Sequence, residues 1–516
     1  MFYILLGVLL GVVIYKLIQL SKFWEDKNVN HEPTWPIVGN MGGVLLQKQH
    51  TMDLIIDLYR KHSHRRYVGI MQFTRPVLLI RDVDLIRQIT TTDFDHFHDH
   101  YKPQNDPLLS KILINLSGHQ WRQMRATLSP VFTTSSMKIM YPLMTECAHD
   151  FVGHFRGKEQ VAVDMKDIFS RFSVDVIAST AFGTKIDSLD EPKNDFFKMG
   201  SRLDQGLYKY VLSKLPFLAE IAGAQVFPKD VIEFFRSVIK DNIDKRRNGV
   251  VRPDLIHLLL EARKGHLKSD FGEDKLEGFA SVEESEVGRN GQPKELTDDD
   301  IVSQAMLFLF AGFDTASTTS CFLAHELAIH PDIQVKLQEE VDGVNRQCNG
   351  KIPFETLLSM KYLDQVVCEC LRLWPPGFEI DRICTKDYTI QPRASHETEV
   401  VLEKGTSILI PVVGIHRDPR YYPNPEKFDP ERFSDDNKAK IVPGTYIPFG
   451  LGPRNCIGSR FALLEIKTLF FHLLSKFDIV PVRGTQIPIK LSAKKLKLTP
   501  ERGFRLGFKP RKGPSY

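Results

Sequence analysis

The stretch between Thr297 and Pro331 constrains the fold of this 516-residue chain more than any other part. It opens with Thr297 and three aspartates, a pattern typical of a helix start, because threonine caps free N–H groups and acidic side chains oppose the helix dipole. No proline follows before Pro331, so the predicted helix spans roughly 50 Å at about 1.5 Å per residue. It is apolar from Ile301 to Phe310, which favours burial across one large domain. Length alone suggests about three domains, and a helix buried across one domain argues against that number.

A second feature is a cysteine in a glycine-rich loop. Cys456 lies in Phe449-Gly450-Leu451-Gly452-Pro453-Arg454-Asn455-Cys456-Ile457-Gly458. Glycines let backbone N–H groups approach the sulfur, and the helix expected after it adds positive potential, so both favour a thiolate. Such a thiolate can bind iron, and a cysteine-ligated haem favours O–O bond cleavage. An inert buried cysteine is the alternative, but the other cysteines have no such loop: Cys147, Cys321, Cys348, Cys368, Cys370 and Cys384.

The middle of the predicted long helix reads Ala311-Gly312-Phe313-Asp314-Thr315-Ala316. Small residues at 311 and 312 would let a flat, bulky group lie against the backbone. A hydroxyl and a carboxylate beside that gap can relay protons, and Thr315 can also bond back to a carbonyl of its own helix. Ordinary helix packing is the alternative for this motif taken alone.

Charged side chains are expected in the interior at two places. Glu369 and Arg372 share a helix face and have apolar neighbours, which predicts a buried pair that Arg432 completes as a structural network. Trp121 and Arg125 also share one helix face. With Arg382 and Arg454 they are candidates to bind buried anions, although each alone is more often a surface residue.

The first residues are predicted to form a membrane anchor. Residues 1–20 are almost wholly apolar, and about 20 such residues cross the bilayer when Lys16 reaches the interface. A cleaved signal peptide is the alternative, but no basic region precedes the apolar run. Lys16, Lys22 and Lys27 favour a cytosolic body. Residues 21–40 contain a proline-rich hinge and read as a linker, which leaves 41–516 as the catalytic domain.

Other parts of the chain yield coarser predictions. Strands are expected at 67–71, 77–80 and around 487–491, and a solvated loop at 264–295. The 68 Lys and Arg against 64 Asp and Glu give a net charge of +4, which gives no reason to expect nucleic acid. Seven scattered cysteines fit a reducing compartment.

Taken together, these motifs closely resemble the cytochrome P-450 superfamily of haem-thiolate monooxygenases, in order and in spacing. The anchor and hinge are similar to the microsomal class, and the segments at 194–200 and 454–462 to the insect family-nine group. The resemblance implies a mostly helical, triangular single domain with a small β-rich lobe. It implies a b-type haem with Cys456 as axial ligand, and Thr315, helped by Asp314, as proton donor in dioxygen activation. The implied haem contacts are Trp121, Arg125, Ala311, Arg382, Phe449 and Arg454.

The resemblance also implies partners and a location. Electrons would come from NADPH through a separate reductase, with cytochrome b5 as a further donor, at the endoplasmic reticulum membrane. Exposed lysines on the cysteine side would meet the acidic reductase: Lys427, Lys438 and Lys440. Two departures matter. Ala316 stands where many members carry Ser or Thr, and His100 where some use an arginine near a propionate.

By the same resemblance, substrate contacts fall in 101–116, 202–212, 308–315, 376–380 and 493–498. The tentative contact residues are Leu116, Phe308, Phe310, Phe378 and Leu496, although many such side chains are plain core. Their apolar character predicts a lipophilic substrate, first of all a foreign compound such as a plant toxin or insecticide. The alternatives are an endogenous hormone, pheromone or fatty acid, a redox-independent isomerase or dehydratase, and a non-catalytic carrier.

Overall fold

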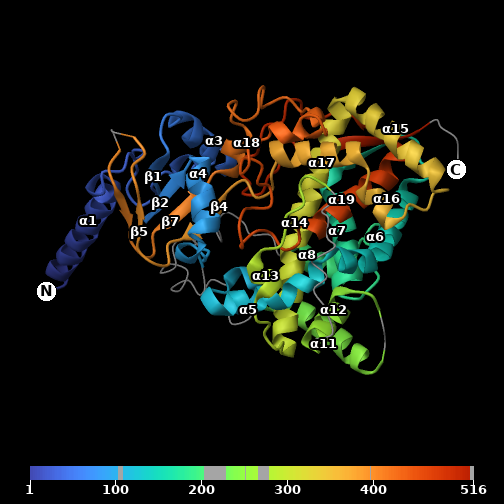
Figure 1. Ribbon diagram of the computed structural model, residues 1–516, viewed down its shortest axis with the longest axis horizontal. Helices are drawn as coiled ribbons and strands as arrows, with labels where there is room; N and C mark the ends of the chain where they lie inside the picture. Colours follow the sequence, from blue (N-terminus) through green and yellow to red (C-terminus); the bar gives the residue numbers. More distant parts are fainter. Residues whose placement is uncertain (103–108, 203–227, 250–251, 265–277, 395–396, 512–516) are drawn as a thin grey trace.

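Helix α14 (Asp298–Ile329) runs through the centre of the computed structural model (Figure 1). The structure describes residues 1–102, 109–202, 228–249, 252–264, 278–394 and 397–511. Thr297 Oγ1 accepts a hydrogen bond from Asp300 N at 3.1 Å, and Asp300 Oδ2 accepts one from Thr297 N at 3.0 Å, so a capping box starts the helix. It ends before Pro331, which begins the next helix. The predicted long core helix is therefore confirmed.

Helices make up most of the body and pack around α14. Its closest partner is α7, and α11, α17 and α19 also contact it. The other α-helices of the described residues are α1 (Phe2–Asp26), α2 (Gly42–Leu45), α3 (Thr51–Lys61), α4 (Val83–Arg87), α5 (Gly118–Leu128), α6 (Thr134–Phe155), α7 (Met165–Ala181), α8 (Asp195–Ser201), α11 (Lys229–Arg247), α12 (Leu255–Arg263), α13 (Glu286–Asn290), α15 (Pro331–Gln347), α16 (Phe354–Leu358), α17 (Lys361–Leu373), α18 (Val412–His416) and α19 (Ser459–Leu474).

The described strands form three sheets, the largest of which lies in a small β lobe near the N-terminus. Four strands pair in the order β1-β2-β7-β4: β1 (Tyr67–Gln72), β2 (Arg75–Ile80), β7 (Ser407–Ile410) and β4 (Ile380–Ile383). β2 and β7 are parallel and the outer pairs are antiparallel. The second sheet has the order β3 (Val161–Asp164), β9 (Arg505–Pro510), β8 (Phe477–Pro481), and β5 (Tyr388–Ile390) pairs with β6 (Val400–Leu402).

Two of the three strand predictions are confirmed, at β1 and β2. The expectation around 487–491 is wrong, because this stretch makes only one isolated bridge, between Leu491 and Pro500. Pro488 lacks the N–H that a ladder requires. The strands at the end of the chain are instead β8 and β9.

Helix α1 leaves the body at one end of the molecule (Figure 1). Tyr3, Ile4 and Val8 are each at least 60% exposed. The helix continues past residue 20 to Asp26, because Trp24 is buried on the sheet and its Nε1 donates to Ile70 O at 3.0 Å. Among the described residues, α14 is the helix that is long and apolar enough to cross a membrane, but it is mostly buried in the core.

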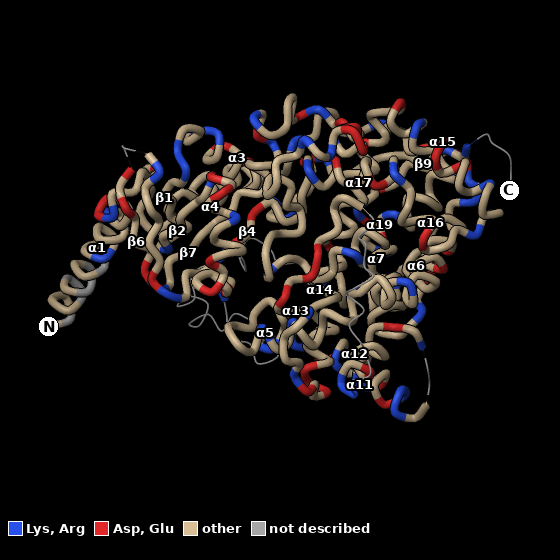
Figure 2. Tube along the Cα trace, viewed as in Figure 1, with Lys and Arg blue, Asp and Glu red and all other residues tan. Residues whose placement is uncertain are grey.

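Residues 278–294 differ from the expected solvated loop. Ala280 is 3% exposed, and the Phe279 ring lies 5.4 Å from the rings of Phe433 and Tyr446. The expected loop is confirmed for this part apart from α13, but the expectation that it is solvated is only partly right, because it packs against the body. Residues 265–277 lie outside the described part of the chain. Elsewhere, positive and negative residues are interspersed along the trace, in keeping with the small net charge (Figure 2).

Candidate active site

The loop that carries Cys456 folds back on itself just before α19. Gly450 and Gly452 have φ of 84° and 74°, which suits residues without a Cβ. A Cβ on Gly452 would lie 1.8 Å from Thr90 O, so no larger residue fits there. Cys456 N donates to Phe449 O at 2.8 Å and closes the loop. The cysteine is thereby held three residues before α19 and keeps exposed surface.

The backbone donor and positive charge expected to favour the thiolate do act on Cys456, but burial outweighs them in the protein alone. The protein packed around Cys456 desolvates the sulfur and raises the pKa of the thiol, although the Gly458 backbone N–H and the charge of Arg125 oppose this rise. A bound metal cation deprotonates a coordinating thiol outright. The loop therefore positions the sulfur, and an iron bound there would favour its thiolate form.

On α14, one short stretch is left uncovered by protein. Ala311 and Thr315, one turn apart, are exposed, whereas Phe313 and Ala316 beside them are buried. Thr315 Oγ1 donates to Ala311 O at 2.6 Å, the back-bond that the sequence allowed. Gly312 does not share this open face: a Cβ there would lie 3.1 Å from Ile177 Cδ1, so its small size serves the packing of α14 on α7.

Phe132 links α14 to the cysteine loop. Its ring centroid lies 4.9 Å from that of Phe308 on α14. On the other side, Phe132 O accepts from Arg460 Nη1 at 3.2 Å, and its Cε1 lies 4.0 Å from the position of a Cβ on Gly458. The open surfaces of α14 and of Cys456 therefore lie in the same part of the molecule.

Asp314 is held by two lysines that the sequence did not indicate. Its Oδ1 lies 2.9 Å from Lys166 Nζ on α7 and 3.2 Å from Lys497 Nζ. Lys166 also donates to Ser317 Oγ and Thr318 Oγ1. Burial raises the pKa of Asp314, but the two ammonium groups outweigh it and hold the pKa below its ordinary value. Asp314 is therefore a carboxylate at neutral pH.

Two of the predicted haem contacts, Arg382 and Arg454, are buried at the loop that carries Cys456. Arg382 donates to Asp381 O and has a buried Nε with no hydrogen-bond partner. Arg454 stacks on the Trp121 ring at 4.2 Å and donates to the carbonyls of His98, Leu113 and Leu116. Burial and the charges of Arg382 and Arg125 lower the pKa of Arg454 to about 9.

His100 and Arg125 are engaged with protein carboxylates. His100 Nδ1 lies 3.0 Å from Asp381 Oδ1, and burial lowers the pKa of His100. Arg125 Nε and Nη2 donate to Glu284, and Nη1 and Nη2 to Asn455. Four of the five N–H donors of Arg125 are thus used within the protein, which leaves at most one for a haem carboxylate.

These features fit a haem. The buried Nε of Arg382 lacks a hydrogen-bond acceptor in the protein, which is costly, and a haem propionate would provide one. Ala311 is left uncovered, as a flat ring against α14 would require, and Phe132 connects this helix to the loop that carries Cys456. Among the predicted contacts, Arg382 has a donor free for a propionate, and Arg125 has at most one.

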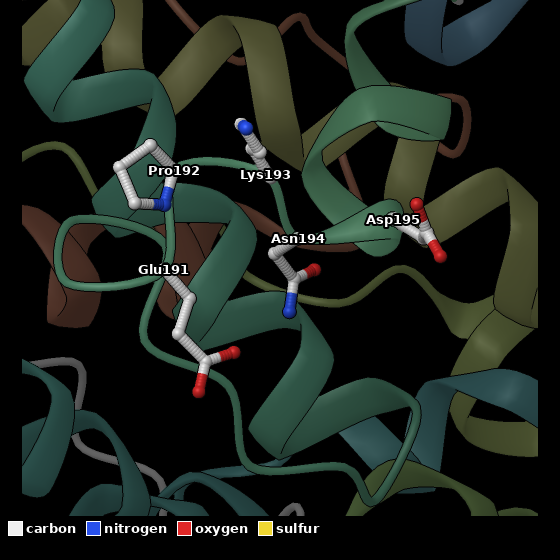
Figure 3. A pocket seen from close by; sticks show the side chains of 5 residues that line it. All are labelled: Glu191, Pro192, Lys193, Asn194 and Asp195. Carbon is white, nitrogen blue, oxygen red and sulfur yellow. The ribbon is translucent and has the colours of Figure 1, made fainter.

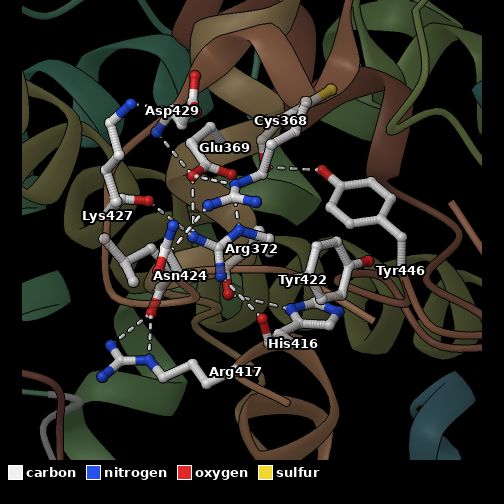
Figure 4. Close-up of polar contacts among 12 residues, drawn as sticks. Cys368, Glu369, Arg372, His416, Arg417, Tyr422, Asn424, Lys427, Asp429 and Tyr446 are labelled. Atoms are coloured by element: carbon white, nitrogen blue, oxygen red, sulfur yellow. Dashed lines mark hydrogen bonds and ion pairs between the residues drawn. The ribbon is translucent and has the colours of Figure 1, made fainter. Parts of the chain in front are cut away.

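Glu369 and Arg372 are fully buried at the centre of a charged network, whose polar contacts Figure 4 shows. Arg372 Nε and Nη2 donate to Glu369 at 2.6 and 2.8 Å, and Arg432 Nε lies 3.3 Å from Glu369 Oε1. Sequence reasoning missed His416, whose Nε2 accepts from Ile447 N at 2.9 Å. Its Nδ1 therefore carries the proton and donates to Arg372 O at 3.1 Å. This histidine ties the network to the segment that leads into the cysteine loop.

The tentative substrate residues lie in two places. Leu116 and Phe308 border Arg454 and Phe132 respectively, and Phe310 is also partly buried on α14. Phe378 and Leu496 form the second group, because both contact His50. The Phe378 ring lies 5.9 Å from the His50 ring, and Leu496 O lies 3.0 Å from His50 Nε2. Within the predicted contact ranges, residues 103–108 and 203–212 lie outside the described part of the chain.

A surface hollow of about 580 Å³ lies elsewhere (Figure 3). Five successive residues line it, Glu191 to Asp195, and none belongs to the predicted site. Three of them are charged, and Asn194 caps α8. This shallow hollow, lined by one surface segment with three charged side chains, is not the predicted substrate site.

Comparisons with known proteins agree with this geometry. The cytochrome P450 family model matches residues 30–508. The chain is 42% identical to cytochrome P450 9e2 of Blattella germanica, over 95% of this chain and 94% of that protein. It is 38% identical to the probable cytochrome P450 9f2 of Drosophila melanogaster, over 94% of each, and 35% identical to cytochrome P450 6k1 of Blattella germanica, over 98% and 96%. The chain belongs to the cytochrome P450 family as an insect member of family nine, a haem-thiolate monooxygenase that receives NADPH-derived electrons through a reductase.

Proposed function

We propose that this monooxygenase oxidises lipophilic foreign compounds, such as plant toxins or insecticides, with Cys456 as the haem ligand. The observation that carries the proposal is the open face of α14 at Ala311 and Thr315, in the same region as the exposed Cys456. The aromatic side chains of Phe308 and Phe310 lie on the preceding turn of the same helix. An apolar substrate would be held there close to the reactive centre.

Each residue has a role in this proposal. The haem supplies dioxygen activation when bound through Cys456. Arg382 and Arg454 bind its carboxylates, and Trp121 supports Arg454 through the stacking contact. Ala311 leaves room for the ring. Thr315 and Asp314 hold and move protons: the Thr315 hydroxyl lies one residue from a carboxylate whose ionised form is stabilised by Lys166 and Lys497.

The location is part of the proposal. Residues 1–20 would anchor the enzyme in the endoplasmic reticulum membrane. Residues 21–40 would link this anchor to the cytosolic catalytic domain, which residues 41–516 would form. The exposed apolar side chains of α1 support this, because they would otherwise face water. Membrane lipid and cytochrome b5 are proposed partners, and Lys427, Lys438 and Lys440 are exposed for contact with the reductase.

Substrate screening tests the proposal. The full chain is reconstituted with reductase and NADPH and offered plant toxins, insecticides, hormones, pheromones and fatty acids. We expect hydroxylated products from foreign compounds that require both NADPH and dioxygen. Turnover confined to one endogenous lipid would overturn the detoxification role, and full turnover without reductase would indicate an isomerase or dehydratase.

A further inference from the structure

The segment 278–294, which we call the proximal strap, lies against the elements that carry Cys456 and Arg125. At one end Phe279 N donates to Asp364 Oδ2 on α17 at 2.9 Å. At the other, Lys294 N donates to Thr127 Oγ1 on α5 at 2.7 Å. Between these points the strap contacts the residue next to Cys456, because Asn455 Nδ2 donates to Glu283 O at 3.0 Å.

Two glycines bring the strap close to α5. A Cβ on Gly291 would lie 2.8 Å from Ala126 Cβ, and one on Gly288 would lie 2.5 Å from Ser129 Oγ. This close approach puts Glu284 in the interior: its side chain is 7% exposed, in a stretch of sequence rich in charge. A buried carboxylate is retained only where it is paired, and its partner is Arg125.

Arg125 joins Glu284 to the cysteine loop. It binds Glu284 through Nε at 3.1 Å and Nη2 at 2.7 Å, a bidentate geometry. Its Nη1 donates to Asn455 O at 2.8 Å, the carbonyl of the peptide that leads into Cys456. The negative charge of Glu284 therefore offsets a positive charge that acts on the sulfur.

We propose that Glu284 is a positioning residue for the haem-thiolate reaction: it fixes Arg125 against the Asn455 carbonyl and keeps the charge beside the cysteine loop balanced. The proposal rests on Cys456 being the iron ligand. Loss of this carboxylate would leave a buried positive charge beside the loop that would hold the iron. Positive charge favours the reduced metal, so its reduction potential rises.

The test compares Glu284→Gln with Glu283→Gln in the haem-loaded full chain. Glu283 is a matched control, because it is the adjacent glutamate, its side chain is 77% exposed and its backbone carbonyl, which Asn455 binds, is unchanged by the substitution. We expect a positive shift of the midpoint potential in E284Q and none in E283Q. We also expect faster amide exchange across residues 449–458 in E284Q.

A merely structural role would lower stability and haem content without moving the potential. Equal potentials in E284Q, E283Q and the natural enzyme would therefore overturn the charge role. Glu284→Asp keeps the charge and shortens the reach, so it should keep the potential and raise the exchange. If E284Q does not load haem, unchanged exchange across 449–458 in E284D would overturn the positioning role. A carbon monoxide difference band unaffected by Cys456→Ala would instead refute the ligand assignment, independently of Glu284.

Discussion

The ammonium group of Lys166 lies 2.9 Å from a carboxylate oxygen of Asp314 and so joins α7 to the centre of α14. The two residues are 148 positions apart, and no local pattern in the sequence pairs them. The contact keeps an acidic side chain ionised in the interior, one residue from the threonine proposed to handle protons.

Lys166→Met should move the acidic limb of the pH profile for NADPH-dependent product formation to higher pH. The pKa of Asp314 rises when one of its two cationic partners is lost. Asp314→Asn sets the lower limit of activity, at about 100-fold below the natural enzyme if the carboxylate takes part in proton transfer. Lys240→Met, at an exposed site on α11 outside the predicted contact ranges, is the control and should leave the profile unchanged. An unchanged profile in K166M would contradict the assignment.

Glu369→Gln should destabilise the fold by about 3–5 kcal/mol, because it leaves Arg372 buried without its charged partner. Both side chains are fully buried. Thermal unfolding and haem content measure the effect. The matched control is Glu431→Gln, which breaks an exposed pair with Lys336 and should cost no more than about 1 kcal/mol. Equal losses in the two variants would show that the buried network is not structural.

His416→Phe should keep the aromatic contact with Tyr446, 5.5 Å away, but remove both hydrogen bonds of the ring. Arg372 O and Ile447 N each lose a partner, at a cost of about 1–3 kcal/mol for each group. Because Ile447 leads into the cysteine loop, we expect the carbon monoxide difference band of the thiolate form to decay faster on storage. His119→Phe, at an exposed site on α5, should behave as the natural enzyme. A stable band in H416F would contradict the link to the loop.

Glu465→Gln should make stability less dependent on pH. Burial raises the pKa of Glu465 to about 8, and Ser173, which donates to Oε1 at 2.7 Å, only partly opposes this. The folded protein therefore keeps a proton that the unfolded chain loses above pH 4.5, so stability falls as pH rises from there to about 8.

The natural enzyme and E465Q should unfold at similar temperatures near pH 5, and E465Q should be the more stable of the two at pH 8. The difference accumulates at about 1.4 kcal/mol per pH unit at most. Glu339→Gln, at an exposed site on α15, controls for the loss of one charge. Parallel stability curves for E465Q and the natural enzyme would contradict the raised pKa.

Features set by local sequence could be predicted. The capping box of Thr297 and Asp300 and the end of α14 before Pro331 depend on residues a few positions apart. The glycine loop around Cys456 and the spacing of Glu369 and Arg372 are local in the same way. Such motifs identified the fold and the family.

Long-range pairings could not be predicted. The partners of Asp314 and of Arg125 come from segments more than 140 residues away. A lysine or glutamate in a charged stretch of sequence is expected to be exposed to solvent, so its sequence context gives no sign of such a buried pairing. Glu284 belonged to a segment expected to be loop, and its burial depends on the close approach that Gly288 and Gly291 allow. Gly312 was assigned to the haem face, whereas a one-residue step around the helix turns it toward Ile177.

The most direct test of the account is the carbon monoxide difference spectrum of Cys456→Ala beside that of Cys348→Ala. Cys348, at the end of α15, is also a free thiol, so its removal controls for the loss of one cysteine. The account predicts that C456A loses the thiolate-type band and its NADPH-dependent turnover, and that C348A keeps both. A thiolate-type band of natural intensity in C456A would show that another residue binds the iron.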